Sequence, residues 1–358
     1  MTETDVTSIL RESLGDELRH SVQEIQRTQT SRRKHSESTT LYRVRLSNNQ
    51  ERWVWVKRLN DNSNAGISED RTTRDYDLNK WLYETFDPSG PFRVPRPLAF
   101  SPEHRFIVTE HVPGKCLQGE ITREARRLPL RPASQDIREH MHRAGQWLHA
   151  FQSATEDYYP GKSSGLDPLP IKNEDRTANQ TLSRLEQLVR LRPTVFDEVF
   201  ASSVERSIDH SMHQIHGSKH QTRYAICSTH GDFFAGNLIF HGPSVTGIDF
   251  TGSTWGSPWF NVSYFCFHLE TALNKYIATT QLAREARKAF LEGYGYESTG
   301  TDFWQSSPEM QLNYVSHCIS RLLSLSESKW LAASPRELAK RYALYKTKKE
   351  LLTHVKKL

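Results

Sequence analysis

The chain of 358 residues has few cysteines and no long apolar segment. Its four cysteines are widely spaced and form no C-x-x-C pair, which argues against a zinc cluster or a disulfide framework and favours a reducing compartment (Cys116, Cys227, Cys266 and Cys318). No apolar run approaches the roughly 18 residues that a membrane-spanning helix needs. The N-terminal residues are polar and acidic, unlike a secretory signal. These absences predict a cytoplasmic protein without a transmembrane segment.

A large excess of charge of one sign is also absent. The chain carries 47 basic and 42 acidic residues, and the net charge of +5 supports only a mild preference for anionic ligands. No RNA- or DNA-binding motif is present, so no nucleic-acid partner is expected. The composition, with 36% hydrophobic residues, is that of an ordinary globular protein, and the length allows two subdomains.

The first 114 residues predict a small sheet with one helix packed on it. Residues 41–47 and 52–59 alternate apolar and polar side chains across a turn, which is typical of a hairpin. Residues 70–86 carry apolar side chains at helical spacing. Two further short strands are expected at 92–100 and 105–112, a helix at 5–20, and a polar loop at 27–40 that includes Arg32, Arg33 and Lys34.

After Gly114 the pattern becomes mostly helical. Residues 137–154 place Met141, Ala144, Leu148 and Phe151 on one stripe. Further helices are expected at 174–192, at 195–216, and from Tyr264 to the end. The fold class predicted is therefore α+β with two lobes: a nucleotide-binding lobe at 1–114 and a larger helical lobe at 115–358.

The stretch "STHGDFFAGNLIF" carries the chemistry. Its His230-Gly231-Asp232 triplet is followed by Asn237, five residues after the aspartate. Phosphoryl transfer needs a carboxylate that orients the acceptor hydroxyl and oxygen ligands that hold metal against the phosphates. The protein-kinase motif H-R-D-x-x-x-x-N supplies both from one loop, with the same spacing. Asp232 is therefore the candidate base and Asn237 a candidate metal ligand.

Two further residues occur where such an enzyme needs them. Asp249 ends the apolar run "GIDF", twelve residues after Asn237, where an acid can hold a metal that bridges phosphate oxygens. Lys57 lies within the strand pattern "WVWVKRL", where a lysine would point toward the α- and β-phosphates. Taken alone, Asp232 is also compatible with a turn residue and Lys57 with a solvated position at a sheet edge.

The order of three motifs resembles the aminoglycoside phosphotransferase and choline kinase family. The motifs are H-G-D-[FL]-x-x-x-N, then I-D-[FW], then W-G-x-P. The resemblance extends from about residue 36 to 296 through "SESTTLYRVRL", "TRDYDLNKWL" and "IVTEHVPGKCL". It implies a protein-kinase-like fold and the transfer of phosphate from ATP, with Mg²⁺, to a hydroxyl of a small molecule.

The resemblance also implies roles for individual residues. Asp232 would be the catalytic base, Asn237 and Asp249 would hold Mg²⁺, and Lys57, paired with Asp75, would contact the α- and β-phosphates. His230 would brace the catalytic loop. The adenine would be received by backbone groups of the hinge between the lobes (Glu110, His111 and Val112).

The chain departs from the family pattern at two positions. Asp75 stands where glutamate is usual, so its reach to Lys57 is one methylene shorter, and Asp77 is an alternative partner. Asn261 stands where the family usually has an aspartate that organises the loop.

Other features leave alternatives open. Trp255, Trp259 and Phe260 are compatible with a substrate pocket or with the core. The basic C-terminal residues 340–358 are compatible with a solvated helix or with peripheral contact to an anionic membrane. The alternative functions are therefore a kinase of a glycan or lipid-linked sugar at the membrane face and a nucleotide-binding pseudokinase. The sequence identifies neither the acceptor nor the oligomeric state.

Overall fold

The fold is taken from a computed structural model of the whole chain. It describes residues 7–8, 10–12, 14, 21–33, 37–59, 68–127, 132–156, 158–169, 171–217, 226–273, 280–296, 303–327 and 335–356. Within the expected helix at 5–20, the described residues are helical, and Leu10 and Leu14 are buried against the small sheet.

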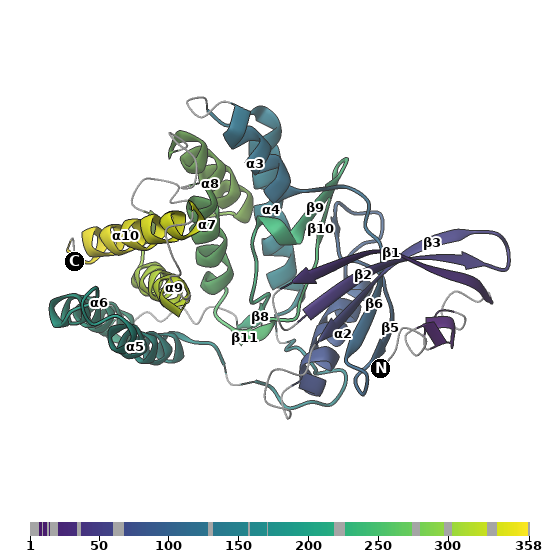
Figure 1. The fold of residues 1–358 in the computed structure, drawn as a ribbon, viewed down its shortest axis with the longest axis horizontal. Coiled ribbons are helices and arrows are strands. Elements are labelled where there is room, and N and C mark those ends of the chain that lie inside the picture. Colours follow the sequence, from purple (N-terminus) through teal and green to yellow (C-terminus); the bar gives the residue numbers. More distant parts are fainter. Residues whose placement is uncertain are drawn as a thin grey trace.

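A five-stranded antiparallel sheet forms one end of the molecule, at the right of Figure 1. The predicted hairpin is confirmed, because Leu41 pairs with Trp55 and Arg45 with Glu51. Alternate side chains of the two strands, including Val44 of β2, face the core of the sheet. The strand order is β1-β2-β3-β6-β5, with bounds Val22–Arg33, Glu37–Leu46, Glu51–Leu59, Phe106–Glu110 and Pro97–Ser101 respectively.

The expectation of a loop at 27–40 is wrong for the residues that the structure describes there. Strand β1 runs to Arg33 and includes Arg32, and β2 begins at Glu37, while Lys34 lies outside the described residues. β1 is an edge strand that packs on the small core through Val22 and Ile25. An edge strand needs few apolar residues, so its polar sequence looks like a loop.

Helix α2 (Ser68–Thr85) connects the small sheet to the rest of the molecule. Its Tyr76 stacks on Phe100 of β5, with ring centroids 4.1 Å apart. Trp81 stacks on Tyr158, which lies beyond the sheet, at 4.3 Å. Since α2 is anchored on both sides, a side chain on its inner face has a fixed position between the sheet and the helical region.

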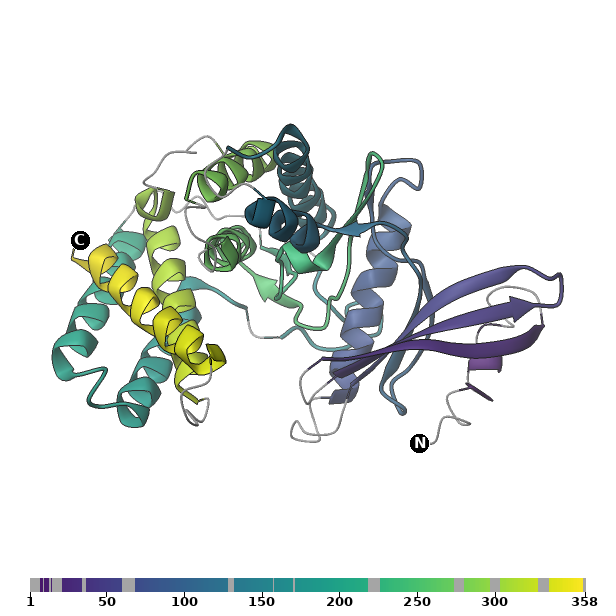
Figure 2. The same ribbon diagram turned by 45° about the horizontal axis from the view of Figure 1, so that its top comes forward.

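Short strands lie between the small sheet and the helices (Figures 1 and 2). One sheet has the order β4-β10-β9-β7 and the other pairs β11 with β8. The turns next to these strands carry the candidate catalytic residues. Their bounds are Phe92–Arg93 for β4, Lys115–Cys116 for β7, Cys227–Thr229 for β8, Leu238–His241 for β9, Ser244–Gly247 for β10 and Thr254–Gly256 for β11.

The helical region confirms the predicted stripe on α4, where Met141, Ala144, Leu148 and Phe151 are all buried. Gly145 lets α4 and α8 cross closely, because a Cβ there would lie 2.1 Å from the carbonyl oxygen of Phe290. The bounds are Leu117–Arg127 for α3, Gln135–Ala154 for α4, Glu174–Leu191 for α5, Glu198–Gly217 for α6, Trp259–Leu273 for α7, Thr280–Tyr294 for α8, Pro308–Glu327 for α9 and Pro335–Val355 for α10, with short 3-10 helices η1 at Ala235–Asn237 and η2 at Phe303–Gln305.

The basic helix α10 packs on the main core through Leu344 and Leu351, while Tyr342 and Tyr345 are exposed. Among the described residues, no helix is both long enough and apolar enough to cross a bilayer. Contact of α10 with a membrane surface stays a prediction.

Candidate active site

A cavity of about 430 Å³ lies between the small sheet and the central strands. Six of the eight predicted site residues line it, although they come from four separate parts of the chain. They are Lys57, Asp75, Glu110, His111, Val112 and Asp249. The other two, Asp232 and Asn237, lie on the loop between β8 and β9.

Lys57 projects from β3 to two carboxylates. Its Nζ lies 3.0 Å from Oδ2 of Asp75 and also contacts Oδ1 of Asp249. The shorter aspartate on α2 therefore does reach the lysine. The alternative partner, Asp77, instead accepts a hydrogen bond from the Tyr158 hydroxyl at 2.8 Å.

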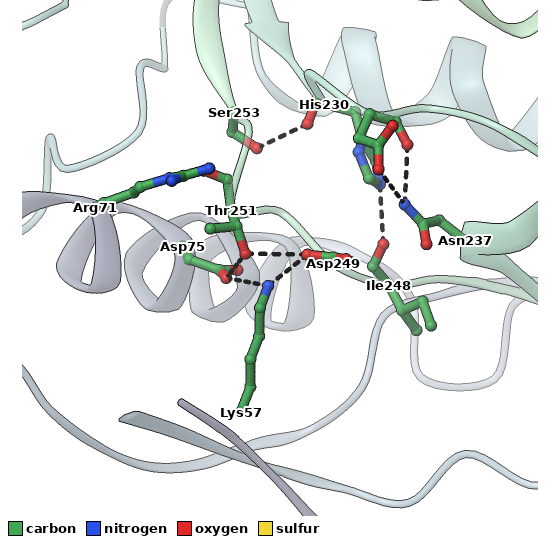
Figure 3. A network of polar contacts seen from close by, with 10 residues as sticks. Lys57, Arg71, Asp75, His230, Asn237, Ile248, Asp249, Thr251 and Ser253 are labelled. Carbon is green, nitrogen blue, oxygen red and sulfur yellow. Dashed lines mark hydrogen bonds and ion pairs between the residues drawn. The ribbon is translucent and has the colours of Figure 1, made fainter. Parts of the chain in front are cut away.

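Thr251 completes this network, and sequence reasoning missed it. Its hydroxyl lies 2.8 Å from Oδ2 of Asp75 and 3.0 Å from Oδ1 of Asp249 (Figure 3). The Nε of Arg71 on α2 donates to the Thr251 carbonyl oxygen at 3.0 Å. One signal was available, since Thr251 follows Asp249 by two residues, where the kinase motif D-F-G has glycine.

Asp249 is held in a constrained conformation. Its φ of 72° lies in the left-handed region, which aspartate tolerates better than most residues. Burial alone would raise the pKa of its carboxyl group, but the charge and hydrogen bond of Lys57 outweigh burial and hold this pKa well below its usual range. The carboxylate is therefore ionised and available to a cation at neutral pH.

Two side chains orient Asp232. Nδ2 of Asn237 donates to its backbone oxygen at 2.9 Å, and the Tyr264 hydroxyl donates to its Oδ1 at 2.7 Å. Burial, and then the charge of Asp232, raises the pKa of Tyr264 above its ordinary value, so the hydroxyl remains a donor. Tyr264 was also missed, because it lies on α7, far from the loop in sequence.

His230 braces the loop, as expected. It is fully buried, and its Nε2 lies 3.1 Å from the carbonyl oxygen of Ile248, next to Asp249. Burial lowers its pKa. Its backbone N–H donates to Oδ1 of Asn261 at 3.2 Å, so the asparagine at the departure from the family pattern still organises this loop.

Gly231 explains why this motif has glycine in place of the kinase arginine. Its φ is +79°, and a Cβ there would lie 1.8 Å from the carbonyl oxygen of Gly252. No other residue could occupy the position without moving the loop that follows Asp249.

Two of the three backbone N–H groups at the predicted hinge are already used in hydrogen bonds to the small sheet and the residues beside it. The amides of Glu110 and His111 donate to the carbonyl oxygens of Arg96 and Trp53 at 2.9 and 2.8 Å. The amide of Val112 donates no backbone hydrogen bond within the described part of the chain, so it is available to a ligand.

Trp55 faces the same cavity, two residues before Lys57 on β3. Its indole Nε1 donates to Nδ1 of His111 at 3.0 Å. Burial lowers the pKa of His111, which favours the neutral imidazole that this hydrogen bond requires. The position of Trp55 beside the hinge suits stacking on a nucleobase.

The residues fit a magnesium ion. Oδ1 of Asn237 is buried and has no hydrogen-bond partner among the residues that the structure describes. Together with the ionised Asp249 it supplies two oxygen ligands, and Mg²⁺ typically takes one or two protein oxygens plus phosphates and water. In the same described residues, no group of three or more His, Cys, Asp or Glu side chains suits a metal held by protein alone.

The predicted aromatic residues have different surroundings. Trp259 packs against the main core, whereas Phe260 lies 5.7 Å from the Tyr264 ring. Trp255 packs edge-on against Tyr159, with ring centroids 6.0 Å apart. Of the three, Phe260 thus lies beside a residue that contacts Asp232.

A model of the APH phosphotransferase enzyme family matches residues 32–305, well over half of the chain. The chain belongs to this family. The phosphotransferase matches no curated protein sequence.

Solved structures show the same fold at low identity. A streptomycin–ATP complex of APH(2'')-IIa has a TM-score of 0.54 and 13% identity over 99% of both chains. A thermostable mutant of APH(4)-Ia with ADP and hygromycin B has a TM-score of 0.56 and 13% identity over 98% of both. A GDP complex of aminoglycoside 2'-phosphotransferase-IIIa has a TM-score of 0.53 and 14% identity over 99% of both. These matches confirm the predicted α+β kinase-like fold.

Proposed function

We propose that this phosphotransferase moves the γ-phosphate of ATP, with Mg²⁺, to a hydroxyl group of a small molecule. The observation that carries the proposal is the position of Asn237. Its Nδ2 orients Asp232, while its buried Oδ1 is left for a cation. One side chain thereby links the proposed base to the proposed metal site, as direct transfer between two bound substrates requires.

Each step follows from residues of this chain. Asp232 accepts the proton of the acceptor hydroxyl as its oxygen attacks the γ-phosphorus, and the bond to the β–γ bridging oxygen breaks to release ADP. Lys57 binds the α- and β-phosphates from β3, and Asp75 keeps it in place. Mg²⁺, held by Asn237 and Asp249, would neutralise charge on the β- and γ-phosphates.

Residues 1–114 would then form the nucleotide-binding lobe and 115–358 the lobe that carries the base and receives the acceptor. The base of the nucleotide would lie against Trp55 and hydrogen-bond to the hinge at Glu110–Val112. We expect the enzyme to act in the cytoplasm, where ATP is available.

The direct test is Mg²⁺-dependent release of ADP across a panel of hydroxylated acceptors. Asp232→Asn should lower acceptor-dependent release by about 10²- to 10⁴-fold, the usual contribution of a general base. Asp87→Asn is a matched control, because this aspartate is exposed and, within the described part of the chain, hydrogen-bonds to Ser89 and Gly90 next to it. Tight nucleotide binding without release for any acceptor would instead favour the pseudokinase alternative.

A further inference from the structure

We expect the acceptor to approach Asp232 beside Tyr264, whose hydroxyl contacts this aspartate. The cavity lined by Lys57 and Asp249 includes neither Asp232 nor Tyr264. From Tyr264 an aromatic surface continues along α7: the Phe260 ring centroid lies 5.7 Å from that of Tyr264, and the tilted His268 ring has its centroid 4.2 Å from that of Tyr264. Asp232, Tyr264, Phe260 and His268 are all partly exposed, so a ligand can reach them.

Lys172 lies at the far end of this surface. Its Nζ is 3.1 Å from the centroid of the Phe260 ring, and its backbone is fixed by hydrogen bonds to β11 and to the residue after that strand. The amide of Lys172 donates to the Trp255 carbonyl oxygen at 2.6 Å, and its own carbonyl accepts from Ser257 at 3.1 Å. Lys172 therefore has a fixed position beside the Phe260 ring.

Positive charge gathers around this lysine. Arg176 and Arg184 lie on α5 directly after it, and NH1 of Arg184 donates to the Ser320 hydroxyl on α9 at 2.8 Å. Burial, followed by the charges of Arg184 and Arg176, lowers the pKa of the Lys172 ammonium to about 7. His317 on α9 lies near the same two cations. Burial, together with the charges of Lys172 and Arg184, holds the pKa of His317 well below its ordinary value.

In the part of the chain that the structure describes, no carboxylate pairs with Lys172 or with Arg184. By contrast, the partly buried Lys57 at the candidate site is paired with two carboxylates, those of Asp75 and Asp249. Buried cations are normally paired or bound to an anion, so Lys172 and Arg184 lack a counter-charge among the described residues.

We propose that the acceptor carries an acidic group, a carboxylate or a phosphate, that binds Lys172 and Arg184 while its hydroxyl meets Asp232. This inference rests on the proposed function. It also separates this chain from aminoglycoside acceptors, because a polycationic amine next to Lys172 and Arg184 would be repelled.

Residue-resolved labelling tests the acidic-ligand site without knowledge of the acceptor. Pyridoxal 5'-phosphate and pyridoxal, two aldehydes that differ by a phosphate, would be reacted with the full chain at neutral pH. Borohydride reduction and peptide mass spectrometry then quantify labelling at Lys172 relative to Lys80, which is exposed on α2. We expect the phosphate to raise this ratio at least tenfold, about the effect of one charge-assisted pair.

Arg184→Gln should bring the two ratios together, because it removes the proposed second contact to the phosphate. Equal ratios for both aldehydes in the wild-type protein, or no labelling of Lys172 by either, would overturn the proposal. Labelling of Lys172 that is unchanged in Arg184→Gln would remove Arg184 from the site and leave Lys172 as its only anchor.

Turnover with ring-matched sugars tests the same idea in catalysis and distinguishes carboxylate from phosphate. Acceptor-dependent ADP release would be compared for glucosamine, glucose, glucuronate and glucose 6-phosphate, and for the polycation streptomycin. We expect acidic sugars to exceed glucosamine by about tenfold or more in kcat/KM, and Lys172→Glu to reverse that order.

The outcomes separate the two proposals. Preference for glucosamine or streptomycin would refute the acidic acceptor while leaving the kinase in place. If no acceptor supports Mg²⁺-dependent ADP release but pyridoxal 5'-phosphate still selects Lys172, the acidic-ligand site stands and the proposed kinase function fails.

Discussion

On the proposed nucleotide side of the candidate site, Lys57 is held by Asp75 and Asp249, whereas on the proposed acceptor side Lys172 lies over the Phe260 ring and pairs with no acid among the described residues. Both lysines are partly buried. The two carboxylates hold the Lys57 ammonium between them, and the proposed nucleotide with its metal would have to exchange with these contacts. The second lysine lacks such partners, which is what a binding site for an anion requires.

The two sides of the candidate site also differ in the helices and strands that supply their residues. The nucleotide side combines β3, α2 and the turn after β10, and Thr251 cross-links the two acids. The acceptor side combines the start of α5 with α7 and α9, which belong to the helical region. The two sides meet at Asp232, which is oriented by Asn237 from its own loop and by Tyr264 from the acceptor side.

The largest effect should come from Asp249→Asn. Loss of this carboxylate removes a metal ligand and one partner of Lys57, so we expect acceptor-dependent activity to fall at least about a thousandfold, the several kcal/mol that a catalytic metal supplies. Equilibrium binding of ATP with and without Mg²⁺ would locate the loss, since only the Mg²⁺-dependent part should disappear.

Asp77→Asn is the matched control for that change. Asp77 is also buried, and it binds the Tyr158 hydroxyl and the Ser163 amide rather than the cleft. It should lower the free energy of unfolding without removing Mg²⁺-dependent nucleotide binding. Retention of that binding in Asp249→Asn, or its loss in Asp77→Asn, would contradict the assignment of Asp249.

Tyr264→Phe should have the next largest effect. It removes the hydroxyl that donates to Oδ1 of Asp232 and leaves the ring in place. A hydrogen bond to a charged group is worth about 1.5–3 kcal/mol, so kcat should fall roughly ten- to a hundredfold, with little change in the KM for ATP. Tyr294→Phe provides the control, because its hydroxyl makes a comparable bond to Gln152 at 2.6 Å, away from Asp232. Equal losses in both variants would show a general effect on packing.

The residues proposed for the nucleotide side could be picked out from the sequence because each lies in a local pattern. Lys57 lies within a strand, Asn237 follows Asp232 by five residues, and Asp249 lies in the apolar stretch "GIDF". The structure places Lys57 and Asp249 in one cavity, and Asp232 and Asn237 on the loop between β8 and β9. The fold was predictable for the same reason, since α4 and the hairpin show clear apolar periodicity.

The acceptor side was not predictable, because its residues are brought together only by tertiary packing. Tyr264 reaches Asp232 from α7, and backbone hydrogen bonds to β11 and to Ser257 place Lys172 against Phe260. Neither contact has a spacing that a sequence motif could record. Strand β1 was missed for a related reason, because pairing with β2 rather than burial holds its polar sequence in place.

The lowered pKa of Lys172 predicts a dependence of stability on pH. Its pKa is about 7 in the folded protein, lowered by burial and by Arg184 and Arg176, against an ordinary 10.5. Between these values the unfolded chain binds a proton that the folded protein does not, so the free energy of unfolding rises with pH in this window. Below pH 7 both states are protonated, and the cost of the buried charge remains.

Denaturant unfolding of wild type and Lys172→Met across this window would measure the effect. The advantage of the methionine variant should shrink by about 1–2 kcal/mol from pH 7 to pH 9, somewhat below the 1.4 kcal/mol per unit expected for a fully shifted group. Lys80→Met, on the exposed face of α2, should show no such trend. A constant difference for Lys172→Met would mean that this lysine is charged throughout, and that it already has a counter-charge.

The smallest effect should come from Asp75→Glu, which restores the usual residue of the family. Here Oδ2 of Asp75 already meets Lys57 at 3.0 Å and the Thr251 hydroxyl at 2.8 Å, so an added methylene has to displace one of them. Because overpacking of this kind costs about 1–3 kcal/mol, and a small shift of the long Lys57 side chain can absorb part of it, we expect roughly a fivefold loss of kcat/KM for ATP. Thr251→Ala alone removes a hydrogen bond from the same carboxylate, and the double variant should recover activity relative to Asp75→Glu, because the space left by the threonine side chain accepts the longer acid. Such recovery in a double-mutant cycle would show that aspartate and threonine are a matched pair on the nucleotide side. Strictly additive losses would show that the shorter acid and Thr251 act independently.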